Sequence, residues 1–397
     1  MIAVGIDVSK SKSTIAIVDS SGEILMKPTD FMHNESSFSH LATILHSYSD
    51  DVKIVMEATG HYHQPVLKYL LQENFFVCVV NPYVIKKYGD NDLRKSKTDK
   101  KDAIRIAFYT LEKAYSLTPY TILDQKYDEL KFLSRQYNQC VSMRVKARVQ
   151  LSNLLDELMP GIQNILNSRT ADPEDNFLYH FIEKYESYEK IRSMSEKRFI
   201  NSYVKFSNKT HARNPESKAL KIYETAQNNL YTRTNTLSTE IAMKQCIELL
   251  KQTELAANAI MRQMQSIATT LPEYPVVMAM GGVGPRLAPR LIAEIGDTRR
   301  FKSGKALNAY AGNDAPPYQS GQYESTNRHI SKRGSASLRK ACYEVMQCLK
   351  MHKPQDDPVY LFMIKKESEG KPLNVAKMAG VNKFLRIYYA RVMEVYK

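Results

Sequence analysis

The sequence predicts an α/β domain at the N-terminus, followed by a largely helical remainder, and two observations carry this prediction. Across residues 1–115, short apolar runs alternate with segments whose apolar residues recur at helical spacing. Farther along, two long segments keep a three-and-four spacing of apolar side chains, which is typical of long packed helices. The 397 residues suffice for two or three domains. We expect three, at 1–115, 116–270 and 271–397.

The predicted N-terminal domain opens with strands and continues with alternating helices and strands. Three strands are expected at Ile2–Val8, Ser13–Asp19 and Glu23–Lys27, with a Ser-Ser-Gly hairpin turn before the third. The later elements are a helix at Ser37–Ser47, a strand at 52–57, a helix at 63–73, a strand at Phe75–Val80 and a helix at 97–113, begun by a capping box of Ser96 and Asp99. This is the element order of a ribonuclease-H-like domain.

Four acidic residues occupy positions that suit a metal site: Asp7, Glu57, Asp99 and Asp102. Asp7 lies in the first strand and Glu57 ends the fourth, and in this strand order the two strands are neighbours. Asp99 and Asp102 are three residues apart on a helix, so they share a face. Hard divalent cations prefer carboxylate oxygens, and two ions about 4 Å apart can hold the attacking and leaving oxygens of a phosphodiester. Without the strand order, the acids would be better explained as turn residues or partners of lysines.

The net charge and the absence of long apolar stretches limit which classes of partner and which cellular location we expect. The net charge of +14 favours a polyanionic partner, nucleic acid before a membrane surface. No apolar stretch approaches the roughly 18 residues of a membrane span, and the chain enters a strand at residue 2 without a signal-like segment, so we expect a cytoplasmic protein. The five cysteines form no Cys-x-x-Cys pair, which predicts reduced thiols rather than a zinc site or disulfides.

Basic residues crowd around the acids at 99 and 102, and they include Lys95, Lys97, Lys100 and Lys101. A run of charge is usually a solvated face. Beside candidate metal ligands, however, the same run suits neutralisation of a nucleic-acid phosphate.

The two long helices are predicted at 127–158, stopped by Pro160-Gly161, and at about 237–270. They could pair as an antiparallel coiled coil within the chain or join protomers, and the periodicity does not choose between these arrangements. The polar segment 160–236 between them is rich in tyrosine and predicts short helices with loops, to which we assign no chemistry.

A glycine-rich turn precedes a predicted helix at Arg286–Ile295, and the pattern is that of a helix-hairpin-helix motif. Gly282 and Gly284 would let a phosphate approach the backbone, with Arg286 and the amides of the following helix close by. A tight turn without a ligand explains the spacing equally well.

Ser320 precedes a glycine in a polar segment and is a candidate nucleophile. Lys332, Arg333 and Arg339 follow it and could hold a phosphate, and attack by the serine on phosphorus would give a covalent phosphoserine. From the residues alone, an ordinary loop serine is the favoured interpretation.

The combined motifs resemble those of the DEDD transposases, insertion-sequence recombinases related to the Piv-type invertases. The resemblance rests on motifs near both ends of the chain, in the family's order: Gly5-Ile6-Asp7-Val8-Ser9-Lys10, Glu57-Ala58-Thr59-Gly60, Asn81-Pro82, Lys97-Thr98-Asp99-Lys100-Lys101-Asp102-Ala103, Gly282-Val283-Gly284, Ala311-Gly312, Gln319-Ser320-Gly321, Ile330-Ser331-Lys332-Arg333-Gly334 and Leu338-Arg339. The chain departs from the family after Gly312, where Asn313-Asp314-Ala315-Pro316-Pro317 intervenes.

The resemblance implies a specific enzyme. It implies a RuvC-like N-terminal domain whose acidic tetrad binds Mg²⁺, which here falls on Asp7, Glu57, Asp99 and Asp102, and a nucleophilic serine, which here is Ser320. It also implies donor and target DNA as partners, a structured guide RNA from the same element, and a homodimer or homotetramer. The alternatives are a RuvC-like hydrolytic, structure-specific nuclease, in which the serine has no role, and a non-enzymatic nucleic-acid-binding protein.

Overall fold

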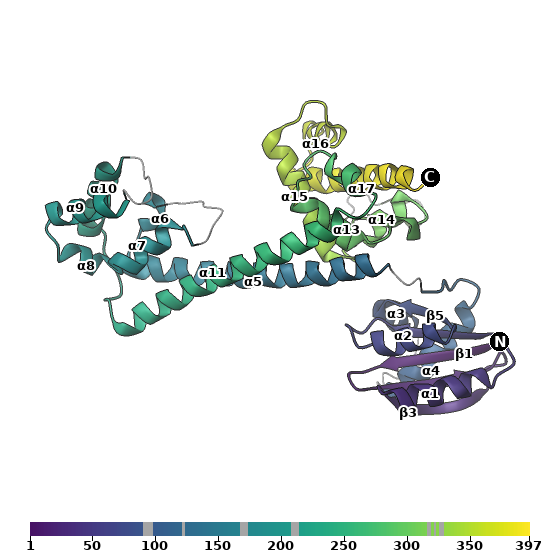
Figure 1. Cartoon of the computed structure of the whole chain (residues 1–397). Coiled ribbons are helices and arrows are strands. Elements are labelled where there is room, and N and C mark those ends of the chain that lie inside the picture. The colour runs from purple at the N-terminus through teal and green to yellow at the C-terminus, as the bar shows by residue number, and fades with distance from the viewer. Residues whose placement is uncertain are drawn as a thin grey trace. The chain divides into compact units, whose positions relative to one another are not determined.

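The computed structural model describes residues 1–89, 98–120, 124–166, 174–207, 214–315, 319–320, 323–324 and 329–397. The chain forms two compact units, Met1–Ile122 and Leu123–Lys397 (Figure 1). The division into three domains is finer than this and stays a prediction. None of the helices in the described ranges is long and apolar enough to span a membrane.

The first unit is built on a mixed five-stranded sheet with the order β3-β2-β1-β4-β5. The three N-terminal strands pair antiparallel, whereas β1 with β4 and β4 with β5 pair parallel. This confirms the predicted neighbourhood of the first and fourth strands. The strands are β1 Ile2–Val8, β2 Lys12–Val18, β3 Ile24–Met32, β4 Val52–Glu57 and β5 Phe76–Val80.

Helices cover both faces of this sheet. One apolar core joins the sheet to α1 and α2, and two smaller clusters join the opposite face to α3 and α4. The alternation of side chains along β1 explains this division, since Ile6 belongs to the first core and Ala3 to the second. The helices are α1 Glu35–His46, α2 Gln64–Gln72, α3 Pro82–Gly89 and α4 Asp99–Lys113.

Two predicted element boundaries in this unit are wrong. β3 continues through Pro28 to Met32, because proline is tolerated on an edge strand and β3 lies at the sheet edge. The cap of α4 is Thr98, whose side chain accepts a hydrogen bond from the Lys101 amide, whereas Ser96 lies outside the described residues.

The backbone of α4 lies directly on β1 at Gly5. A Cβ atom at Gly5 would stand 2.2 Å from the Ala107 nitrogen and 2.3 Å from the Ala103 oxygen, both backbone atoms. The glycine is therefore required by this close approach of helix and strand rather than by its backbone torsion angles.

Replacing Gly5 with alanine is expected to destabilise the first unit by about 3 kcal/mol, because α4 must move away from the sheet. Urea unfolding of the full chain, followed by circular dichroism, measures this. Gly284→Ala is the control, because a Cβ there meets nothing within 4 Å. Equal midpoints for the two variants would contradict the close packing.

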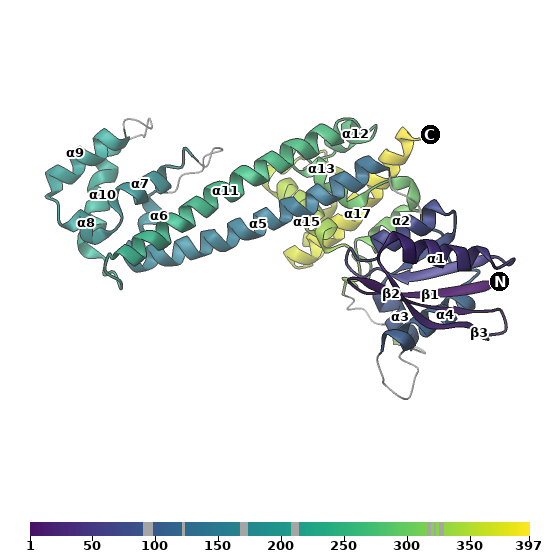
Figure 2. The same cartoon turned by 60° about the horizontal axis from the view of Figure 1, so that its bottom comes forward.

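Two long helices, α5 (Gln125–Leu158) and α11 (Leu237–Ala268), run side by side in opposite directions in the second unit (Figure 2). The pair has an ion pair near its middle, with 3.1 Å between Arg144 and Glu254. The helices occur as predicted and pack within the chain, whereas their description as a coiled coil stays a prediction.

The predicted polar segment forms a small helical subdomain at one end of this pair. Its helices are α6 Ile162–Ile165, α7 Phe177–Tyr185, α8 Tyr188–Arg192, α9 Glu196–Ser207 and α10 Pro215–Asn228. Four of its tyrosines are buried and belong to one apolar core with the adjoining ends of α5 and α11: Tyr179, Tyr185, Tyr188 and Tyr203. The tyrosines of this segment therefore serve packing.

The C-terminal part packs around the other end of the helix pair and is mainly helical, as predicted. Its elements are α12 Tyr274–Met278, α13 Leu287–Ile295, η2 Thr298–Arg300, α14 Gly304–Tyr310, β6 Gln319–Ser320, β7 Tyr323–Glu324, α15 Ala336–His352, α16 Pro358–Ser368 and α17 Leu373–Val395. The five cysteines are free, as predicted.

A buried carboxylate connects α5 to this C-terminal part. Glu294 on α13 accepts hydrogen bonds from Ser134 and Arg135 of α5, at 2.9 and 3.1 Å. It also accepts one at 3.2 Å from Ser335, the residue that caps α15. Only 2 % of Glu294 is exposed, so these partners replace the water that a buried charge needs.

Candidate functional site

Asp7 and Glu57 lie at the same edge of the sheet. Ile6 pairs with Met56 in the parallel register of β1 and β4, and the two acids are the next residue on each strand. Ile6 and Met56 face the core with α1 and α2, so strand alternation directs Asp7 and Glu57 to the face that α4 covers. Both acids are half-buried. The register confirms that the two acids lie on adjacent strands, as the strand order predicted.

The N-terminus of α4 lies at this same edge. Ala103, near the start of α4, lies against Gly5, whereas Thr110, near its end, donates a hydrogen bond to the carbonyl of Val4. The helix therefore runs in the direction opposite to β1, and its N-terminus lies toward the end of the strand that carries Asp7. The pKa of Lys12, at the start of β2, is raised mainly by its hydrogen bond to Asp30 and to a lesser degree by the charge of Asp99. Asp99 and Asp102 therefore lie at the edge that carries the other two acids.

The carboxylates do not close around an ion in this arrangement. Within the described residues, no three acidic, histidine or cysteine side chains are close enough together to hold a metal. Asp102 is instead paired with Arg105, at 2.8 Å, and both side chains are largely covered. Four carboxylates are ligands of the kind that Mg²⁺ prefers. In this structure, however, the Asp102 carboxylate is occupied by its ion pair with Arg105.

The pairing of Arg105 with Asp102 was not predicted from the sequence. The Arg105 side chain also lies against Gly89 at the end of α3, where a Cβ would stand 2.4 Å from Nε. The spacing of three residues between Asp102 and Arg105 was the available signal, since such pairs meet on a helix.

The predicted phosphate-binding lysines are described only in part. Lys100 and Lys101 are exposed in the first turn of α4, beside the acids. The charge of Lys100 also contributes to the lowered pKa of Asp30, which is lowered chiefly by hydrogen bonds from Lys12 and Thr14. Lys95 and Lys97 lie outside the described residues.

Ser320 lies on a short strand rather than in a loop. It pairs with Tyr323 in the two-stranded hairpin of β6 and β7. The predicted loop position of Ser320 is therefore corrected to the last residue of a short strand.

The basic segment that follows this hairpin is held close to the end of α14. The Lys332 amide donates to the Gly312 carbonyl, and a Cβ at Gly334 would stand 2.3 Å from the Tyr310 oxygen. Lys332, with a φ of 54°, and Arg333 are exposed. Arg339 donates to the Ala311 carbonyl at 2.8 Å, so it has a structural role in addition to the predicted phosphate contact.

The departure from the family pattern after Gly312 has a structural function. Asn313 is buried and donates to Asn308 and to the Met378 carbonyl, each at 3.1 Å. Ser331 donates to Asp314, so the inserted polar residues fix the loop to α14, α17 and the basic segment. These contacts join residues far apart in the chain and could not be predicted from the sequence pattern.

The glycine-rich turn between α12 and α13 is explained in part by packing. A Cβ at Gly282 would meet the Val345 carbonyl of α15 at 2.9 Å, and its φ of +73° favours glycine. Gly284 faces open space, and Arg286 donates to Asn258 at 2.8 Å. Phosphate binding at this turn, and the helix-hairpin-helix motif itself, stay predictions.

Comparison with known proteins gives matches at both ends of the chain. Residues 4–160 match the DEDD transposase family of IS110, and residues 274–361 match the transposase family of IS116, IS110 and IS902. A mini-circle protein of IS117 from Streptomyces coelicolor, named as a transposase, is 23 % identical over 83 % of this chain and 80 % of its own length. An uncharacterized IS116 protein from Streptomyces clavuligerus is 23 % identical over 93 % of this chain and 89 % of its own length.

Two further similarities are more limited. The pilin gene-inverting protein of Moraxella bovis is 27 % identical over 27 % of this chain and 33 % of its own length. A structure of Thermus thermophilus RuvC with a Holliday junction substrate matches 30 % of this chain and 99 % of that chain, at 12 % identity. Its TM-score of 0.24 is too low to define a shared fold.

The matches and the acidic sheet edge define the class of protein, an enzyme that acts as a DNA transposase or recombinase. Together the two family matches cover more than half of the chain. The chain belongs to the IS110/IS116 family of DEDD transposases.

Proposed function

We propose that this transposase cuts and exchanges DNA strands through a covalent phosphoserine, at a site where Asp7, Glu57, Asp99 and Asp102 bind Mg²⁺. The proposal is supported by the position of Asp7 and Glu57 at the ends of adjacent strands, and by Asp99 and Asp102 in the first turn of α4, in a chain of this family. A bound divalent cation supplies charge stabilisation for the phosphate under attack. Asp102 would exchange Arg105 for the cation, and the released guanidinium would be left beside the DNA backbone.

Ser320 acts as the nucleophile in this proposal. Its Oγ forms a bond to phosphorus while the bond from phosphorus to the 3′ oxygen breaks, and the 3′ oxygen leaves as a hydroxyl. The serine proton passes to solvent. The reverse reaction with a 3′-hydroxyl of another strand completes the exchange, so the bond energy is conserved and no nucleotide is consumed.

The remaining parts of the proposal concern partners. The exposed Lys100, Lys101, Lys332 and Arg333 are positioned to neutralise phosphates, and Gly284 leaves room for a backbone to approach. We propose a structured guide RNA and a homodimer or homotetramer on the basis of the family motifs. RNA guidance would move target choice from the protein to base pairing.

A covalent adduct tests the proposed chemistry. The full-length protein is incubated with end-labelled DNA that spans the ends of its element, the co-purifying or transcribed RNA, and Mg²⁺, and the products are separated under denaturing conditions. We expect a labelled protein band that chelation of Mg²⁺ removes and whose proteolytic fragment carries phosphoserine at residue 320. Free nicked DNA without any adduct would favour the hydrolytic nuclease instead.

A further inference from the structure

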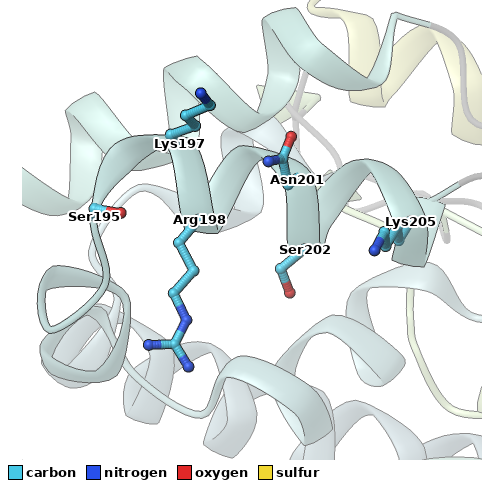
Figure 3. Close-up of a pocket in the computed structure, with 6 residues that line it drawn as sticks. All are labelled: Ser195, Lys197, Arg198, Asn201, Ser202 and Lys205. Carbon is cyan, nitrogen blue, oxygen red and sulfur yellow. The ribbon is translucent and has the colours of Figure 1, made fainter.

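The helical subdomain at the end of the α5–α11 pair carries a basic surface hollow. The hollow has a volume of about 560 Å³ and is lined by the following residues of α9 and its start: Ser195, Lys197, Arg198, Asn201, Ser202 and Lys205. Three of these six carry positive charge, and none is acidic (Figure 3).

The lining residues form two stripes along α9. Arg198, Ser202 and Lys205 are spaced by four and three residues and share one side, whereas Lys197 and Asn201 share the other. Figure 3 shows Arg198 and Ser202 extending from one side of the helix and Lys197 from the opposite side. The stripe from Arg198 to Lys205 spans roughly 10 Å, the axial length of about three DNA base pairs.

The charge of this surface is not compensated by the neighbouring acids that the structure describes. Glu183 pairs with Lys251 at 3.1 Å, and Glu186 pairs with Lys190 at 3.0 Å. No ion pair within the described ranges involves Lys197, Arg198 or Lys205, and all three are exposed. Glu196 at the start of α9 is next to Lys197 in the chain, but no described ion pair joins it to these cations, and all three face solvent.

A fourth cation reinforces this surface from the adjacent helix. Lys184 of α7 donates to the Ser202 carbonyl at 3.5 Å, and its ammonium lies over the ring of Phe206, 4.8 Å from the centroid. The aromatic core of the subdomain holds α9 from behind, because Phe199 and Tyr203 are fully buried on the side of the helix away from the hollow. The positive groups are thus presented on a rigid helix.

We propose that α9 binds the phosphate backbone of duplex DNA, with Arg198 and Lys205 as the principal contacts. Guanidinium and ammonium groups pair with phosphates, and the side-chain amide of Asn201 can donate to a phosphate oxygen of the same backbone. DNA is the polyanion on which an enzyme of this class acts. The surface lies at the far end of a 34-residue helix from the C-terminal part, so it holds a DNA segment away from that part of the second unit.

A double substitution with a matched control tests this site. The full-length protein carrying Arg198→Gln and Lys205→Gln is compared with one carrying Lys218→Gln and Lys221→Gln, which removes the same charge from exposed positions on α10. Binding to a labelled DNA duplex of arbitrary sequence is measured by fluorescence anisotropy over a series of salt concentrations.

We expect the α9 variant to bind duplex DNA of any sequence more weakly than the unmodified protein does. The slope of log affinity against log salt concentration should be smaller in magnitude by about two. The α10 control should keep the slope of the unmodified protein. A charge-conserving variant, Arg198→Lys with Lys205→Arg, should restore it, which separates loss of contact from loss of fold.

The following results would contradict binding of duplex DNA by α9. An unchanged slope in the α9 variant, or an equal loss in the α10 control, would show that these cations do not contact DNA specifically. A loss confined to a structured RNA probe, with duplex binding intact, would assign the surface to RNA instead. Because the measurement is binding without cleavage, its result does not depend on the phosphoserine proposal.

Discussion

Replacing Asp7 with alanine is expected to lower Mg²⁺-dependent strand cleavage by at least about 10³-fold, since loss of a metal ligand removes several kcal/mol of transition-state stabilisation. Asp7 lies on β1, the central strand of the sheet, and Glu57 lies on the adjacent strand β4. The start of α4 lies at the same edge. Cleavage of end-labelled DNA, with Mg²⁺ varied, measures the effect.

Asp51→Ala is the matched control for this substitution. Asp51 lies just before β4, at the opposite edge of the same sheet, and its exposed side chain stands 3.8 Å from Lys53. The control should cleave as the unmodified protein does. If the Asp7 variant retained full cleavage while remaining folded by circular dichroism, the acidic edge would not be the catalytic centre.

Replacing Ser320 with alanine is expected to abolish the covalent protein–DNA adduct and strand exchange together, because the only proposed nucleophile is lost. DNA binding should persist, since the exposed Lys332 and Arg333 and the basic start of α4 remain. Denaturing gels report the adduct, and anisotropy reports binding.

Ser325→Ala, at the next serine along the chain, is the control and should form the adduct normally. Persistence of cleavage without an adduct in the Ser320 variant would identify water as the nucleophile and support the hydrolytic alternative. Transfer of the adduct to another serine would place the nucleophile elsewhere in the C-terminal part.

The sheet and its acidic edge could be predicted because they depend on patterns that are local in sequence. The alternating direction of side chains along β1 and the order of strands and helices suffice to bring Asp7 and Glu57 to one edge. The helical phase of α4 then places Asp99 and Asp102 together, whichever residue begins the helix.

Other features could not be predicted because they depend on contacts between distant residues. The pairing of Asp102 with Arg105 is local, but it is one of several pairings that so basic a segment allowed. The role of Asn313 requires knowledge that Met378 lies beside it, 65 residues farther along the chain. The basic surface on α9 depends on how the helices pack and on the pairing of Glu183 and Glu186 with lysines outside the hollow.

The hydrogen bonds of Glu294 have a mechanical consequence. Ser134 and Arg135 contact it from the long helix α5, and Ser335 contacts it two residues after Arg333. A twist or slide of α5 would break these bonds and leave a carboxylate stranded in the protein interior, at a cost of several kcal/mol. These hydrogen bonds therefore couple movement of α5 to the segment that contains Lys332 and Arg333.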